Sequence, residues 1–162
     1  MRITFPRLPD HEKAYAVIER DDGVVYRLYG GVAGASLPHD VRHLVVERSL
    51  GIRDGVWGEI ACGAVSRPLP HVHGRRPPHA ELLANLAERV AALDEPTPAQ
   101  IRRLAGTVLP AAPDGSVEVD PEAIAAAARA LQVEASRWAR LRPGQELVYE
   151  WPPVPRQRAA KG

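Results

Sequence analysis

Apolar and polar residues alternate at both ends of the chain, which is the spacing of half-buried β-strands. The first alternating segments are residues 2–8 and 14–29, and the second is divided by Asp22-Gly23. An Asp-Gly pair between two alternating segments is a strong hairpin signal, because both residues tolerate the backbone angles of a tight turn. Residues 146–151 alternate in the same way, so we expect a final strand that pairs with the N-terminal hairpin.

Helical patterns begin after this hairpin. Ser36 is placed to cap a helix from about Pro38 to Leu50, and Gly51 is placed to end it. The apolar segment 55–65 follows after a short loop. Its length and its small residues favour a second helix, although an apolar run this short also fits a strand.

Three further helices are expected in the second half of the chain. Apolar spacing indicates one over residues 82–93, and Thr97-Pro98 is typical of the start of a shorter helix that extends through residues 100–104. Asp120-Pro121 repeats this signal before a long amphipathic helix that reaches about Leu141. The apolar stripe of this last helix comprises Ile124, Ala128, Leu131, Ala135 and Trp138.

The remaining segments are rich in proline and polar residues. We expect irregular connections at residues 66–78 and 106–119, and a disordered tail at residues 152–162. Together these patterns predict one α+β domain over residues 1–151. In it, a small antiparallel sheet, formed by the N-terminal hairpin and the C-terminal strand, packs against four or five helices.

Composition excludes several function classes. The net charge is +1 and basic residues are interspersed with acidic ones, so no basic patch predicts nucleic-acid binding. No apolar run approaches the roughly 18 residues of a spanning helix. A single cysteine, Cys62, allows neither an internal disulfide nor a zinc site built from cysteines. These features, with the absence of a secretory signal, favour a cytoplasmic protein, and the abundance of Arg and Ala over Lys is typical of a bacterial source.

Four potential metal ligands lie within the stretch L-P-H-D-V-R-H-L-V-V-E, at His39, Asp40, His43 and Glu47. At 100° per residue their side chains share one arc of about 100° on the predicted helix. The neighbouring positions are largely apolar, and a buried charge must be paired or coordinated. Imidazole and carboxylate are ligands for zinc, iron or manganese, and histidines four apart can share one ion.

The next segment contributes a further candidate. Glu59 is the only charged residue between Asp54 and Arg67, so its carboxylate needs a partner. If the two segments form an antiparallel helical pair, Glu59 can face His39 and His43 and complete the ligand set. Asp40 is then a fourth ligand or the partner that orients His43, and Glu47 is available as a general base.

A simpler interpretation needs no metal. Asp40 can complement the helix dipole in the first turn, and His43 and Glu47 can form a surface pair one turn apart. Arginines nearby can neutralise Glu47 and Glu59. His71 and His73 belong to a Pro- and Arg-rich stretch, with His79 nearby, and are interpreted as parts of a solvated loop, although an H-x-H pair can also bind metal or cover a site.

The motif H-D-V-R-H followed by V-W-G-E-I-A resembles the signature of the coenzyme Q4 family of ubiquinone-biosynthesis proteins. The resemblance covers only residues 39–61, and the spacing from His43 to Glu59 is longer than the family pattern. It implies zinc bound by His39, Asp40, His43 and Glu59. It also implies a metal-dependent removal of a carboxyl group from a polyprenylated ring, within a lipid-synthesising complex.

The sequence therefore favours a divalent-metal-dependent enzyme, with zinc preferred, that hydrolyses or decarboxylates a small organic acid or ring substrate. The alternative is a non-catalytic accessory or binding protein in which the cluster holds a structural metal or a buried polar network. A further alternative is a regulatory module whose basic linker and tail contact a protein partner.

Overall fold

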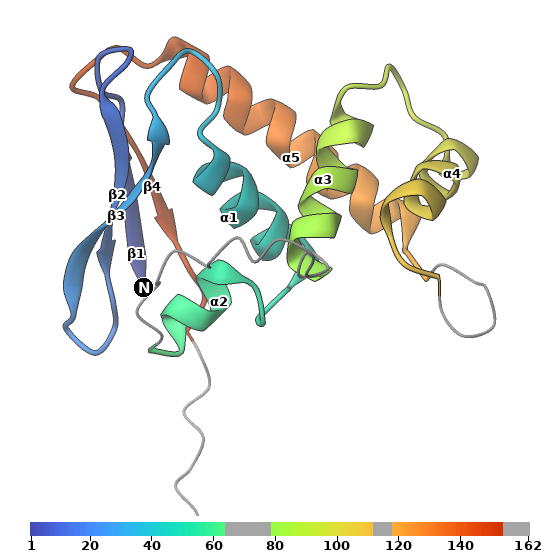
Figure 1. Cartoon of the computed structure of the whole chain (residues 1–162), viewed down its shortest axis with the longest axis horizontal. Helices are drawn as coiled ribbons and strands as arrows, with labels where there is room; N and C mark the ends of the chain where they lie inside the picture. Colours follow the sequence, from blue (N-terminus) through green and yellow to red (C-terminus); the bar gives the residue numbers. More distant parts are fainter. Residues whose placement is uncertain (64–78, 112–117, 154–162) are drawn as a thin grey trace, which may run out of the picture.

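The computed structural model describes residues 1–63, 79–111 and 118–153. A four-stranded antiparallel sheet stands at one end of the molecule, and the helices extend away from one of its faces (Figure 1). The strands are β1 (Arg2–Pro6), β2 (Lys13–Glu19), β3 (Val25–Val32) and β4 (Glu146–Glu150), in the order β3-β2-β1-β4. The predicted α+β class is confirmed.

The sheet joins the two ends of the chain. The hairpin of β2 and β3 turns at Gly23, whose φ of +85° is the left-handed conformation that glycine adopts readily. Strand β4 pairs with β1 from Arg2 opposite Glu150 to Pro6 opposite Glu146. The final strand therefore joins the N-terminal sheet as expected, but its partner is β1, which separates it from the hairpin of β2 and β3.

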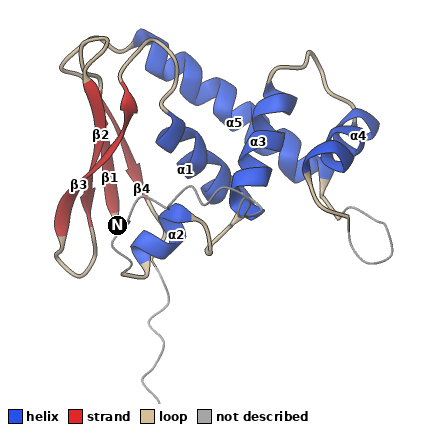
Figure 2. Ribbon diagram, in the orientation of Figure 1, coloured by secondary structure: helices blue, strands red, loops and turns tan. Residues whose placement is uncertain are grey.

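Five helices are described, and Figure 2 shows their distribution beside the sheet. They are α1 (His39–Leu50), α2 (Val56–Ala61), α3 (His79–Ala91), α4 (Pro98–Val108) and α5 (Pro121–Arg140). Of the two interpretations of segment 55–65, the helix is confirmed for the part that forms α2. Helix α4 begins at the predicted cap, where Thr97 and Gln100 form a capping box, but it continues to Val108, so the expectation of an irregular connection from residue 106 is wrong for residues 106–108.

The start of α1 differs from expectation. Its N-cap is Pro38, and no side chain caps it, so the predicted capping by Ser36 is wrong. Pro38 fixes an extended backbone (φ −57°, ψ 144°) before the first turn, and this geometry starts the helix without a hydroxyl. Gly51 ends the helix in the left-handed conformation, as predicted.

Two apolar clusters hold the elements together. The larger lies between the sheet and helices α1, α2, α3 and α5, and includes Ile3, Ile18, Leu44 and Trp57. The smaller joins α3, α4 and α5. Half-buried Leu50 packs against both clusters, so the end of α1 links the sheet side of the molecule to the α4 side.

Several expectations concern segments that the structure does not describe. The loop histidines His71 and His73 and residues 154–162 of the predicted tail lie outside the described residues. Among the described helices, none combines the length and the apolar character needed to cross a membrane.

Gly58 tests the packing of α2. A Cβ atom placed there would lie 2.1 Å from the backbone oxygen of Arg53, whereas one on Gly106 in α4 would meet nothing within 4 Å. We expect Gly58→Ala to lower the free energy of unfolding by about 1–3 kcal/mol, because backbone must move. The control Gly106→Ala should be neutral or stabilising, since alanine favours helices. Equal effects in urea unfolding would contradict this packing.

Candidate metal centre

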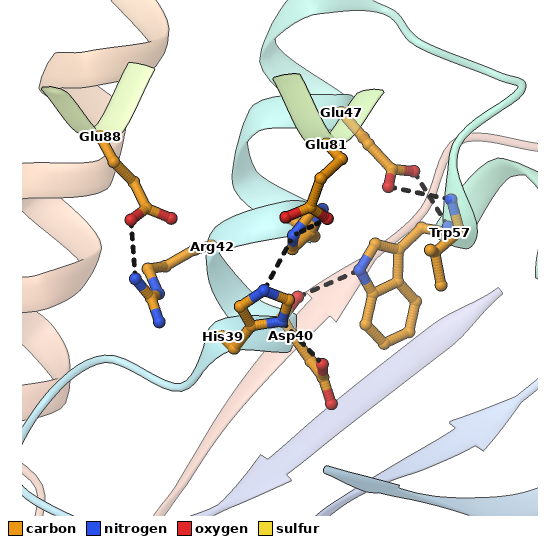
Figure 3. Close-up of polar contacts among 9 residues, drawn as sticks. His39, Asp40, Arg42, Glu47, Trp57, Glu81 and Glu88 are labelled. Atoms are coloured by element: carbon orange, nitrogen blue, oxygen red, sulfur yellow. Dashed lines mark hydrogen bonds and ion pairs between the residues drawn. The ribbon is translucent and has the colours of Figure 1, made fainter. Parts of the chain in front are cut away.

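Two histidines on α1 and a glutamate on α3 converge at one point. His39 and His43 are one helical turn apart, and their Nε2 atoms are 3.2 Å from each other. The Oε2 atom of Glu81, in the first turn of α3, lies 3.2 Å from the same Nε2 atom of His43 (Figure 3). One ligand atom from each residue falls within a group spanning no more than 4.8 Å, which is close enough to hold a metal ion.

This group lies at the boundary between the interior and solvent. The side chain of His43 is only 7% exposed, whereas those of His39 and Glu81 are 58% and 47% exposed. The buried histidine is therefore fixed by packing, while the other two donors are accessible from outside.

The separations suit a small divalent ion. Ligand atoms about 2.0–2.1 Å from a tetrahedral zinc ion lie about 3.3 Å from one another. Both separations from His43 Nε2 are 3.2 Å, which is close to this value. Two imidazoles and one carboxylate are also a common donor set for zinc.

Asp40 lies behind His39. Its Oδ1 atom is 3.5 Å from Nδ1 of His39, the ring nitrogen that does not face His43. Its other oxygen lies close to the backbone of β3, and a Cβ atom on Gly30 would be 2.6 Å from it. Asp40 therefore borders His39 and not His43, the histidine that the sequence hypothesis gave it to orient.

The environment shifts the pKa values of the two histidines in opposite directions. The hydrogen bond with Asp40 raises the pKa of His39 above its usual value. Burial lowers the pKa of His43, although the charge of Glu81 opposes the shift. His43 is therefore held toward the neutral imidazole form, which is the form that binds metals.

Glu47 has a different environment from the histidines. It is buried, and its carboxylate accepts hydrogen bonds from the backbone N–H groups of Val56 (3.0 Å), Trp57 (2.9 Å) and Gly58 (3.4 Å) at the start of α2. These bonds satisfy the free donors of a helix start. Both oxygens are engaged there, so the geometry gives no support to the general-base role predicted for Glu47.

One predicted ligand lies away from this site, and one residue of the site was not predicted. Glu59 is exposed on α2 and does not belong to the group of ligand atoms at His39, His43 and Glu81. Sequence reasoning missed Glu81, which immediately precedes the apolar stripe of α3 and carries no local motif. A carboxylate in the first turn of a predicted helix is common, so only the packing of α3 on α1 identifies it.

A pocket of about 330 Å³ opens beside the metal centre. It is lined by the ends of the strands, the loop before α1, the side of Trp138, and the side chains of His39, Asp40 and Arg42. Arg42 also connects α1 to α3, because its Nη1 atom donates to Oε2 of Glu88 at 2.7 Å. The candidate centre thus borders a cavity of the size that binds small molecules.

Comparisons with known proteins suggest no function for this site, so we interpret it from its geometry. No family model matches the chain, and no curated protein or solved structure shows significant similarity to it. The resemblance of residues 39–61 to the coenzyme Q4 signature stays a prediction.

Glu47 gives a pH-dependent prediction. Burial raises its pKa to about 7, against the opposing effect of the three backbone donors. Because the folded-state pKa lies above the unfolded value, the native protein binds more protons, and the contribution of Glu47 to stability falls as pH rises from about 4 to about 8. In urea unfolding, wild type should lose about 3 kcal/mol relative to Glu47→Gln over this range. A difference that does not change with pH would contradict the raised pKa.

Proposed function

We propose that His39, His43 and Glu81 bind one divalent cation, with zinc preferred, and that the site is catalytic. The observation that carries this proposal is the convergence of three donor atoms from two helices within 4.8 Å. Nitrogen and carboxylate donors suit zinc, iron or manganese, and two histidines with one carboxylate are a ligand set found in catalytic zinc sites.

Two features favour a catalytic site over a closed structural one. Among the described residues three protein ligands converge, and two of them are substantially exposed, so water or substrate can reach a further coordination position. The pocket of about 330 Å³ also touches His39, so a small molecule bound there lies next to the centre. A bound divalent cation supplies polarisation of a substrate oxygen, or a lowered pKa for its water.

The protein residues hold this site in position. The Asp40 carboxylate favours a proton on Nδ1 of His39, which leaves Nε2 free as a donor to the cation. Burial keeps His43 neutral and fixes its ring between α1 and α3. Glu81 adds the negative charge that offsets part of the charge of the cation.

The reaction class that this site supports is hydrolysis or a lyase reaction on a small substrate. The decarboxylation that the coenzyme Q4 resemblance implies is one member of this class. In this proposal Glu81 takes the place that the sequence hypothesis gave to Glu59, because Glu81 lies next to His43 and Glu59 is exposed elsewhere.

A second candidate function is favoured by one observation. The pairs His43–Glu81 and Arg42–Glu88 both connect α1 to α3, at 3.2 Å and 2.7 Å. Two such contacts side by side can serve as a polar network that fixes the two helices in a non-catalytic binding protein. In the polar network the two glutamates have the same role, so replacing either should have a similar effect. In the metal site only Glu81 is a ligand, so the two replacements should differ.

Zinc binding separates these proposals. We expect the zinc-free protein to bind one equivalent of zinc in calorimetry and to unfold at a higher temperature when zinc is present. Glu81→Gln and His43→Ala should each weaken zinc binding at least about tenfold, since each removes a ligand. The matched control is Glu88→Gln, which also breaks a contact between α1 and α3 but should leave zinc affinity unchanged.

The opposite pattern would favour the polar network. In that case no zinc binds at micromolar concentrations, and Glu81→Gln and Glu88→Gln lower the unfolding temperature by similar amounts. Stoichiometric zinc that is unaffected by Glu81→Gln would contradict the ligand set proposed here.

A further inference from the structure

The pocket beside His39 has an apolar wall and one cationic residue. Buried Phe5 and Trp138 line it from the side of the sheet and of α5. Among the described residues that border the pocket, Arg42 is the only arginine or lysine. The pocket therefore combines an apolar surface with a single positive charge, which is an arrangement that orients a small molecule by one anionic group.

The guanidinium group of Arg42 is only partly used by the protein. Glu88 accepts a hydrogen bond from Nη1, and Nε is buried without any hydrogen-bond partner. A guanidinium group has five N–H donors, and it binds carboxylates and phosphates through two of them at once. Its side chain is 33% exposed, so it can turn toward a ligand while Glu88 remains in contact.

Asp40 also borders this pocket, and its charge opposes the binding of an anion. Its carboxylate is directed to other partners, however, with one oxygen at Nδ1 of His39 and the other against the backbone at Gly30. Both Asp40 oxygens thus have neighbours other than the guanidinium group of Arg42.

We propose that this pocket binds the anionic group of a compact substrate, a carboxylate or a phosphate, through the guanidinium group of Arg42. The ligand then extends from Arg42 along the apolar wall toward His39. That the reacting part of the substrate meets a metal ion there rests on the proposed function, whereas the anion site itself stands on the pocket and Arg42.

The test is a titration of the zinc-free protein followed by NMR. The probes are butyrate, inorganic phosphate and the neutral analogue butyramide. The reporter is the indole N–H signal of Trp138, because this side chain lines the pocket, and the signal of Trp151 is an internal control. We expect at least one anion to shift the Trp138 signal saturably and butyramide to bind at least about tenfold more weakly.

Variants identify the residue that binds the anion. Arg42→Gln should weaken anion binding at least about tenfold, and Arg48→Gln on the same helix should not. Glu88→Gln keeps the guanidinium group and removes its competitor, so it should bind the anion as tightly as wild type or more tightly. If Arg42→Gln does not fold, Arg42→Lys keeps the charge but loses the paired donors and should show weakened binding.

Several results would overturn this proposal. They are equal binding of butyrate and butyramide, no response of Trp138 to either anion, unchanged binding in Arg42→Gln, or equal losses in Arg42→Gln and Glu88→Gln. The stronger of the two anions identifies the substrate group as carboxylate or phosphate. Because zinc is absent from this titration, its failure leaves zinc binding by His39, His43 and Glu81 standing, and a failure of zinc binding leaves the anion result interpretable.

Discussion

The burial of α1 is the constraint on which the rest of the structure depends. This helix packs between the sheet and the other helices, and all its apolar residues except Leu50 have almost no exposed surface. Every polar side chain on it must therefore find an internal partner or reach an edge. Glu47 meets the start of α2, His43 meets Glu81 on α3, and the Asp40 backbone oxygen accepts from Nε1 of Trp57 (Figure 3).

These contacts also position the candidate site. Glu47 fixes α2 at one side of α1. Its carboxylate, which the sequence suggested as a general base, therefore has a structural role. The contacts of His43 and Arg42 fix α3 at another side and bring Glu81 to the histidines. The packing around α1 therefore also brings His39, His43 and Glu81, which are close enough to hold a metal ion, together at the point where α1 reaches solvent.

The sequence predicted the elements well, because strand alternation, helical stripes and capping residues are local signals. It also predicted His39 and His43 as neighbours, since one helical turn separates them. It did not predict Glu81, which reaches His43 only through the packing of two helices distant in the chain. Glu59 was expected to face the histidines, but the N-terminus of α2 meets α1 at Glu47, and Glu59 is left exposed.

X-ray absorption of the zinc-loaded protein tests the central claim most directly. The account predicts a first shell of nitrogen and oxygen ligands at about 2.0–2.1 Å that includes two imidazoles, and one imidazole in His39→Ala. A zinc shell without imidazole, or one that His39→Ala leaves unchanged, would contradict it.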